Sequence, residues 1–425
     1  MKTIPAQLRL PFDSAAFPQN GAGREPNGQA NRLAFEDRAF HDWYRFVLSF
    51  PPHLVNTYAE EFGLDARSVV LDPFCGTGTT VVECKLNGIR AIGLEANPFA
   101  HFASSVKIDW QIDPDLLLSG ARDVAGRALK LLKGRGIDDS LTFDGQTKDL
   151  ELKTLDPKAA ELLITNSISP LPLHKTLVVL ECLREHAGQP YYRHALLALA
   201  NALVFKISNL HFGPEVGVGK PKADAAVVSA WMLEIQKIAS DLRLVAGKKS
   251  PDCEAHLVDA RQLASVIQPN SVDAVITSPP YPNEKDYTRT TRLESVVLGF
   301  IRNKAELRDR KKRLIRSNTR GVYKEDDDDK WVKDNSEIQR IAKEIERRRI
   351  ELGKTSGFER MYGKVTQLYF GGMARHLSEL RTVLRPGAHL AYVVGDQASY
   401  LRVMIRTGQL LAGIAEGLGY EVLRL

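Results

Sequence analysis

A polar residue, two prolines and an aromatic ring directly follow an apolar run at residues 272–282, VDAVITSPPYP. Proline lacks a backbone N–H and fixes its own φ, so Pro279 and Pro280 stiffen the chain where the expected strand ends. Such a turn continues a sheet poorly, but it holds Ser278 Oγ, the Pro279 carbonyl and the Tyr281 ring in fixed positions. The segment therefore predicts a rigid set of hydrogen-bond acceptors beside an aromatic face.

A second group of residues that could bind a ligand or take part in a reaction lies in VVLDPFCGTGTT, residues 69–80. Gly76 and Gly78 let the backbone approach a ligand where a Cβ would collide, and Asp72 can accept a hydrogen bond from a ligand ammonium or hydroxyl. Glu95 ends the next strand about twenty residues later, where open α/β sheets place the acid that binds both ribose hydroxyls. The dinucleotide pattern fails because Val81 stands at its third glycine position. A carboxylate also opposes a pyrophosphate, so an adenosine with a cationic tail, as in S-adenosylmethionine, fits better.

The elements that must position these groups form a strand and helix alternation. Short β-branched runs predict buried parallel strands at residues 68–72, 90–95, 254–260, 272–278 and 388–396, with a last strand at 420–425. Helix patterns occupy residues 79–88 and 367–387, the second closing on Pro386 and Gly387. This order predicts an α/β fold, a doubly wound, Rossmann-like sheet.

Two long stretches interrupt that alternation. Residues 104–250 are helical and rich in Leu and Ala, which predicts an inserted helical subdomain, and residues 301–364 form a second, charged insertion. The predicted organisation is then a flexible lead at 1–35, three parts of the core at 36–103, 251–300 and 365–425, and the two insertions between them.

The motifs together resemble the amino-methyltransferases of DNA, which methylate N4 of cytosine or N6 of adenine. DPFCGTGTT, GLEANP and TSPPY carry the resemblance, with FPPHLVNTYAEEFG upstream and HLVDARQL, whose acid in this family reaches the adenine of the cofactor. The resemblance covers the sheet-forming parts and neither insertion. It implies that S-adenosylmethionine binds at Pro51, Asp72, Pro73, Phe74, Gly76, Gly78, Thr79, Glu95 and Asp259, and that catalysis uses Ser278, Pro279, Pro280 and Tyr281.

This resemblance gives the proline turn a chemical purpose. The exocyclic amine of a base is a poor nucleophile because its lone pair is delocalised, and fixed acceptors for its N–H groups stabilise the charge that develops during methyl transfer. The expected reaction is a direct displacement on a base that is flipped out of the duplex and stacks on Tyr281. Serine at the first position favours cytosine N4, because the adenine enzymes more often carry Asp or Asn there.

Other functions remain open at this stage. An N6-adenine enzyme follows closely, then an RNA guanine-N2 methyltransferase, and from a different class a catalytically silent module that binds nucleic acid. A restriction or defence nuclease is the kind of protein partner that a DNA methyltransferase suggests.

A dense basic segment follows the catalytic turn in RNKAELRDRKKRLIRSNTR, residues 302–320. We expect it to contact DNA phosphates, above all through Arg310, Lys311, Lys312, Arg313 and Arg316, although a solvated helix face explains the same pattern. Asp326 to Asp329 would repel DNA, and we expect them to fold onto the basic segment when no substrate is bound.

The composition is consistent with this assignment. The net charge is +6, and the four cysteines are scattered without a metal-ligand spacing, which predicts a reducing cytoplasm and neither a zinc site nor disulfides. No apolar run is long enough to cross a membrane. Trp43, Tyr44 and Phe46 are expected to be core aromatics.

Overall fold

The computed structural model describes residues 38–45, 49–140, 151–213, 216–283 and 285–425. The predicted N-terminal lead and Phe46 lie outside these residues. A five-stranded parallel sheet is at the centre, with strand order β5-β2-β1-β6-β7. Its strands are β1 (Val69–Asp72), β2 (Arg90–Glu95), β5 (Cys253–Leu257), β6 (Val272–Thr277) and β7 (Leu384–Tyr392).

Successive residues of these strands point to opposite faces of the sheet, and each face has its own core. Val70 and Ile276 belong to one core, while their neighbours Leu71 and Val275 belong to the other. All four side chains are fully buried. Because helices cover both faces, the inner strands β1 and β6 are largely apolar and buried, and the predicted α/β fold is confirmed.

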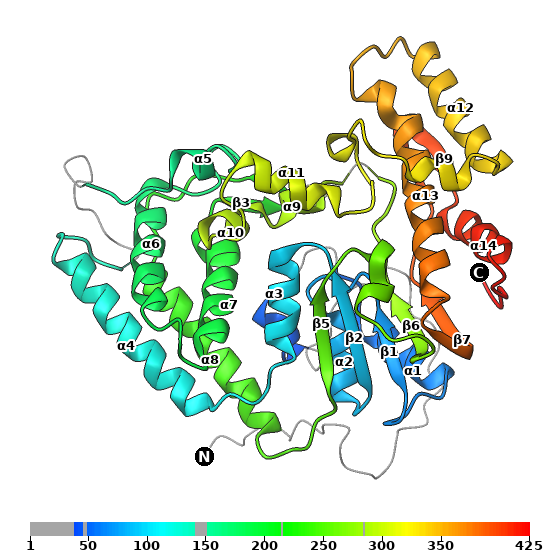
Figure 1. The fold of residues 1–425 in the computed structure, drawn as a ribbon. Coiled ribbons are helices and arrows are strands. Elements are labelled where there is room, and N and C mark those ends of the chain that lie inside the picture. The colour runs from blue at the N-terminus through cyan, green and yellow to red at the C-terminus, as the bar shows by residue number, and fades with distance from the viewer. Residues whose placement is uncertain (1–37, 46–48, 141–150, 214–215, 284) are drawn as a thin grey trace, which may run out of the picture.

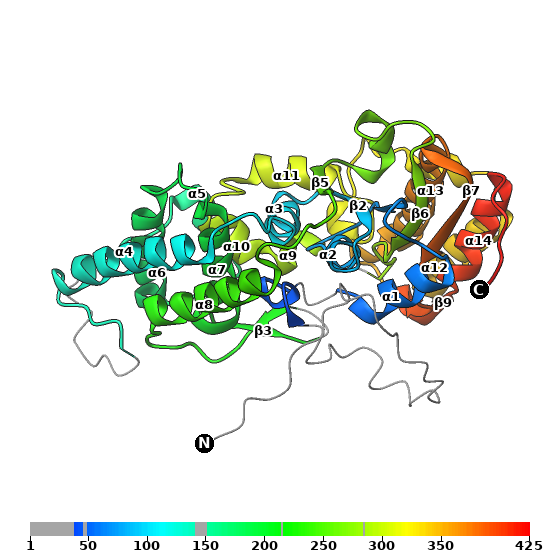
Figure 2. The same ribbon diagram turned by 90° about the horizontal axis from the view of Figure 1, so that it is seen from below.

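The first core joins the sheet to the helical insertion. It includes residues of α2 (Thr79–Leu86), α3 (Pro98–Lys107), α4 (Pro114–Lys133), α6 (Pro170–Arg184), α7 (Tyr192–Ala202) and α8 (Val227–Val245). Figures 1 and 2 show α4, α6, α7 and α8 grouped beside the β5 edge of the sheet. Trp43 and Tyr44, which are 1% and 2% exposed, lie in this core as predicted. The remaining elements here are α1 (Pro52–Glu61), α5 (Pro157–Ala160) and the hairpin of β3 (Leu210–Phe212) and β4 (Val216–Val218).

The second core joins the other face to the charged insertion. It includes residues of α12 (Ser336–Glu351), α13 (Tyr362–Leu380) and α14 (Thr407–Gly417), which lie beside the β7 edge in Figure 1. The chain reaches α12 through α9 (Tyr287–Thr290), α10 (Arg292–Val297), α11 (Lys304–Lys312) and the short helix η6 (Asp328–Val332). A small antiparallel hairpin of β8 (Gln397–Ser399) and β9 (Val403–Ile405) precedes α14. Each insertion is thus built onto one face of the sheet.

Two predictions about the C-terminal region are wrong. The helix expected to close on Pro386 and Gly387 ends at Leu380, and both residues lie inside β7, where its register with β6 shifts. Proline is tolerated there because β7 is an edge strand. Residues 420–425 are not a strand, since the Tyr420 hydroxyl donates to the Leu377 carbonyl at 2.7 Å and Arg424 pairs with Glu61.

Within the described residues, no helix is long and apolar enough to span a membrane.

Candidate active site

A cavity of about 280 Å³ lies at the carboxyl ends of the central strands. In a parallel sheet these ends share one edge, which is the usual ligand site of an open α/β fold. The cavity brings together most of the residues predicted for both halves of the reaction. Its lining includes Pro73, Phe74, Gly76, Thr79, Glu95, Asp259, Ser278, Pro279, Pro280, Tyr281 and Arg313.

The two glycines of the turn after β1 have different roles. Gly76 lines the cavity with φ at +53°, and a Cβ added there would meet nothing within 4 Å. Gly78 is outside the lining, has φ at +91°, and an added Cβ would lie 3.0 Å from the Cβ of Ser104 on α3. The expected approach of a ligand at Gly76 stays a prediction, and the position of Gly76 at the cavity is consistent with it. Gly78 admits helix α3.

Asp72 is buried directly before this turn and does not itself line the cavity. Its Oδ1 accepts hydrogen bonds from Thr277 Oγ1 at 2.6 Å and from the Phe74 N–H at 3.0 Å. Its Oδ2 is buried and has no hydrogen-bond partner among the described residues. Burial raises the pKa of Asp72 to about 6. Because Asp72 does not line the cavity, its carboxylate would act on a ligand there through its negative charge, from behind the turn.

Glu95 lines the cavity at the end of β2. Its Oε2 accepts from the Gly76 N–H at 3.0 Å and its Oε1 accepts from the Asn97 N–H at 2.6 Å. These bonds fix the carboxylate while leaving further lone pairs for ligand hydroxyls. Burial raises the pKa of Glu95 to about 7, against the smaller opposing effect of the two backbone N–H groups.

A buried lysine is hydrogen-bonded to the glycine turn. Lys107, the last residue of α3, is 1% exposed and donates to the carbonyls of Thr77 at 2.9 Å and Tyr44 at 3.2 Å. Burial lowers its pKa to about 7. Lys107 thereby ties the turn to the segment that leads into the upstream motif. Pro51 of that motif is buried outside the cavity, whereas its neighbours Ser49 and Phe50 line it.

Asp259 lines the cavity just beyond β5 and is held by an arginine. The Arg261 guanidinium donates to both carboxylate oxygens, with Nε at 3.0 Å from Oδ1 and Nη2 at 2.6 Å from Oδ2. The Arg261 N–H also donates to Oδ1 at 2.9 Å. No role was expected for Arg261, although it lies within the motif HLVDARQL.

On the opposite side of the cavity, the proline turn carries two hydroxyls that donate hydrogen bonds to the same carbonyl. Ser278 Oγ lies 3.1 Å from the Tyr281 hydroxyl, and both hydroxyls donate to the carbonyl of Val393, at 3.1 and 3.2 Å. The Tyr281 N–H donates to the Tyr287 hydroxyl at 3.1 Å. The bonds to Val393 fix both side chains of the turn against a residue that is distant in the sequence, and the bond to Tyr287 fixes the backbone of the turn.

Several lining residues were missed by the sequence analysis. Three of them, Asn283, Lys285 and Tyr287, follow the proline turn. Their nearness to this turn in the sequence could have identified them as residues of the site. Leu314 and Ile315 reach the cavity from the charged insertion. Buried Asn283 Oδ1 has no hydrogen-bond partner among the described residues.

The residues predicted to bind DNA do not form one exposed surface. Arg316 is 4% exposed and forms a bidentate pair with Asp326, with both N–O distances at 2.8 Å. Lys311 pairs with the buried carboxylate of Asp286 at 2.6 Å. A phosphate contact by Arg316 is thus contradicted, because its guanidinium is already paired and shielded from solvent.

The other three side chains of the predicted set are more accessible. Arg313 is 46% exposed at its side chain and lies at the mouth of the cavity, while Lys312 and Arg310 are 38% and 27% exposed. Among the acidic residues, Asp326 does fold onto the basic segment, as predicted. Asp328 instead binds Arg261, outside that segment.

Comparison with known proteins agrees with the geometry. A family model described as DNA methylase, which covers N6 and N4 methyltransferases, matches residues 45–104. The type II methyltransferase M.BsoBI of Geobacillus stearothermophilus is 26% identical over 427 residues, which cover 93% of this chain and 81% of that protein. The type II methyltransferase M.AvaI of Nostoc sp. is 22% identical over 402 residues, covering 89% of this chain and 79% of that protein.

No solved structure gives a significant match. The family match nevertheless falls on the glycine turn and Glu95, and the longer matches extend over both insertions. A cavity that joins this turn to the proline turn is the geometry that an amino-methyltransferase requires. The chain therefore resembles the DNA amino-methyltransferase family over most of its length, and these comparisons support a DNA methyltransferase.

Proposed function

We propose that this protein transfers a methyl group from S-adenosylmethionine to the exocyclic N4 of cytosine in DNA. The observation that carries the proposal is the single cavity lined by Gly76 and Glu95 on one side and by Ser278 and Tyr281 on the other. In the proposed complex the target nucleobase lies between these two sides. Serine as the first residue of the proline turn favours cytosine over adenine.

The residues around the glycine turn fit the chemistry of the proposed cofactor. Glu95 has lone pairs left for two ribose hydroxyls, and the unpartnered Oδ2 of Asp72 supplies negative charge beside the turn, where a cationic amino-acid tail would lie. Asp259 stands at the far end, where the family places the adenine. When bound, S-adenosylmethionine supplies an electrophilic methyl group.

Ser278 is proposed to receive the target amine. Because its hydroxyl donates toward Val393, the Oγ lone pairs are left to accept an N–H of the base. Together with the Pro279 carbonyl, this acceptor stabilises positive charge that builds on the nitrogen during displacement. Among the residues that the structure describes, no basic side chain is hydrogen-bonded to Ser278, so the amine is proposed to lose its proton to water after transfer.

Tyr281 is proposed to stack against the extruded base, which cannot reach the cavity while it is paired in a duplex. Arg313, at the cavity mouth, is proposed to neutralise a DNA phosphate with Arg310 and Lys312. The relatives are named type II methyltransferases, and we extend that class to this chain, which makes a restriction nuclease its expected companion.

The direct test is to incubate the protein with methyl-labelled S-adenosylmethionine and DNA, digest the DNA and identify the labelled nucleoside. N4-methylcytosine is the expected product. N6-methyladenine would correct the base while retaining the mechanism, and label in RNA alone would overturn the proposed substrate. Failure to label either nucleic acid would overturn the function.

A further inference from the structure

Asp259 is oriented by a buried guanidinium. Asp259 is 9% exposed and lines the cavity, and its carboxylate accepts hydrogen bonds from Arg261 Nε, Nη2 and backbone N–H. A carboxylate has about four lone-pair sites. Oδ1 accepts from the Arg261 backbone N–H and from Nε at 3.0 Å, while Oδ2 accepts from Nη2 at 2.6 Å and from the same Nε at 3.1 Å. These three N–H groups leave about one of the four lone-pair sites for a donor in the cavity.

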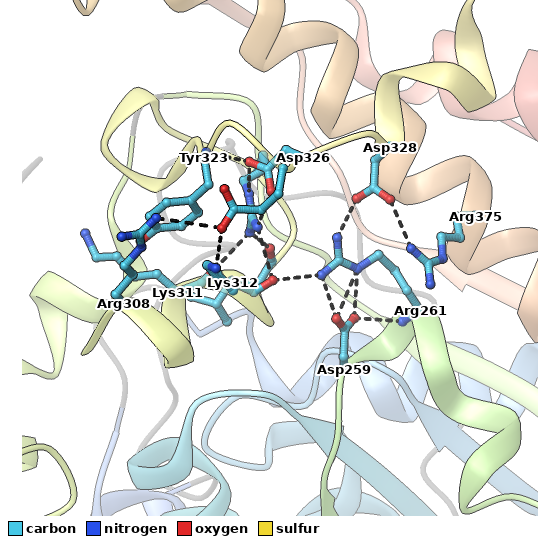
Figure 3. A network of polar contacts seen from close by, with 12 residues as sticks. Asp259, Arg261, Arg308, Lys311, Lys312, Tyr323, Asp326, Asp328 and Arg375 are labelled. Carbon is cyan, nitrogen blue, oxygen red and sulfur yellow. Dashed lines mark hydrogen bonds and ion pairs between the residues drawn. The ribbon is translucent and has the colours of Figure 1, made fainter. Parts of the chain in front are cut away.

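Arg261 is itself fixed by the charged insertion, as Figure 3 shows. Its Nη1 donates to Oδ2 of Asp328, which is 5% exposed, and its Nη2 donates to the Lys312 carbonyl at 3.2 Å. Arg375 of α13 approaches the other oxygen of Asp328 at 3.4 Å. Both ends of the guanidinium are therefore held, and it cannot rotate away from Asp259 without breaking a buried ion pair.

Helix α13 is shaped to admit Asp328. A Cβ added at Gly371 would lie 1.9 Å from the Asp328 carbonyl oxygen, and one added at Gly372 would lie 3.3 Å from Asp328 Oδ2. Glycine inside a helix costs about 1 kcal/mol relative to alanine, so two adjacent glycines need a compensating contact. The close docking of Asp328 is that contact. The backbone of Asp328 is therefore seated against α13 by a contact that does not involve Arg261.

We propose that Arg261 is a positioning residue for cofactor binding, which aligns Asp259 with the amino group of the cofactor adenine and is held in place by Asp328. This inference rests on the proposed function, because the adenine contact of Asp259 is part of it. The acidic segment at residues 326–329 then has a further role. Through Asp328 it completes the adenine end of the site, in addition to neutralising the basic segment through Asp326.

The test compares two ligands that differ only at the contact in question. One is S-adenosylhomocysteine and the other is its analogue with purine in place of adenine, which lacks the 6-amino group. Calorimetry should show that the wild-type protein binds the adenine ligand about tenfold more tightly, as expected for one hydrogen bond to a charged acceptor. Arg261→Lys and Asp328→Asn should reduce that ratio to below about threefold.

The matched control is Asp327→Asn. Asp327 neighbours Asp328 but is 60% exposed at its side chain and pairs with Lys330 on the surface, so the ratio should stay at the wild-type value. If Arg261 has only a structural role, Arg261→Lys should lower the affinity for both ligands by the same factor. The affinity ratio would then stay at the wild-type value, and this result would overturn the inference. If Arg261→Lys fails to fold, Asp328→Asn decides.

The same measurement separates this inference from the proposed function. A wild-type protein that binds both ligands equally would refute the contact of Asp259 with the amino group, and with it the role of Arg261, but not methyl transfer. A wild-type protein that binds neither ligand would refute the proposed cofactor.

Discussion

The hydroxyl oxygens of Ser278 and Tyr281 lie 3.1 Å apart, and both point at one carbonyl, that of Val393 beyond the end of β7. The turn is thus anchored to the neighbouring strand at the level of its side chains. The Val393 N–H also donates to the Thr277 carbonyl at 2.8 Å, which continues the pairing of β6 and β7 up to the site. The acceptors offered to a base are rigid because the sheet extends to them.

Substitutions at these two residues should separate stacking from hydrogen bonding. We expect Tyr281→Phe to keep most of the transfer rate, because the ring remains, and Tyr281→Ala to abolish it. Ser278→Ala should lower kcat by about 10²- to 10³-fold, the usual effect of removing one group that stabilises transition-state charge. Single-turnover transfer of labelled methyl to DNA measures all three.

Cofactor affinity provides the control for these variants. None of the three should change the affinity for S-adenosylhomocysteine more than about twofold, which corresponds to about 0.4 kcal/mol. A parallel loss of cofactor affinity and transfer would mean that the turn only maintains the structure of the cavity.

Cofactor binding should weaken in acid because of Glu95. Burial raises its pKa to about 7, and only the carboxylate accepts both ribose hydroxyls. The competent fraction therefore falls about tenfold between pH 8 and pH 6, and the apparent affinity falls with it. Titrations of S-adenosylhomocysteine at pH 6, 7 and 8 measure this, and Glu95→Gln should bind weakly with a much flatter pH profile.

Glu95 should also make the free energy of unfolding depend on pH, in the direction opposite to that of cofactor affinity. The pKa of Glu95 is about 7 in the folded chain against a usual value of 4.5, so the folded state binds the proton more tightly than the unfolded state. Its contribution to the free energy of unfolding therefore increases as the pH falls from about 7 toward 4.5. Equal pH profiles of stability for the wild type and Glu95→Gln would contradict this assignment.

The two glycines of the turn should respond differently to alanine. Gly78→Ala combines a left-handed backbone with a Cβ 3.0 Å from Ser104, and we expect a loss of about 3 kcal/mol in the free energy of unfolding. Gly76→Ala meets no neighbour and should lose only about 1 kcal/mol. Its new methyl group faces the cavity, so cofactor affinity should fall instead. Urea denaturation and calorimetry compare the two variants, and equal stability losses would refute the distinction.

DNA binding should depend on exposed members of the basic segment only. Arg313→Ala should weaken DNA binding and reduce the slope of log affinity against log salt by about one. Arg316→Ala should instead destabilise the fold by about 3 kcal/mol, because it leaves Asp326 largely buried without its partner. Filter binding across a salt series and urea denaturation distinguish the two effects. An unchanged salt slope in Arg313→Ala would remove Arg313 from the interface.

Much of this protein could be predicted from local sequence. The apolar runs of the inner strands β1 and β6 were recognisable because a strand buried on both faces is almost continuously apolar. The glycine turn and the proline turn could be predicted from their residue types, because each depends on backbone conformations that few residues permit. The failures lay at Pro386 and at residues 420–425, where tertiary contacts decided the local structure.

The charged residues could be located but not assigned from the sequence. Arg316 and Arg313 are three positions apart in one basic run, yet one is buried against Asp326 and the other lies at the cavity mouth. Arg261 and Asp328 are far apart along the chain and meet only because two glycines of α13 admit the acidic segment. Local sequence specifies backbone preferences, whereas the partner of a charge depends on which distant segments pack together, and only the tertiary structure decides that.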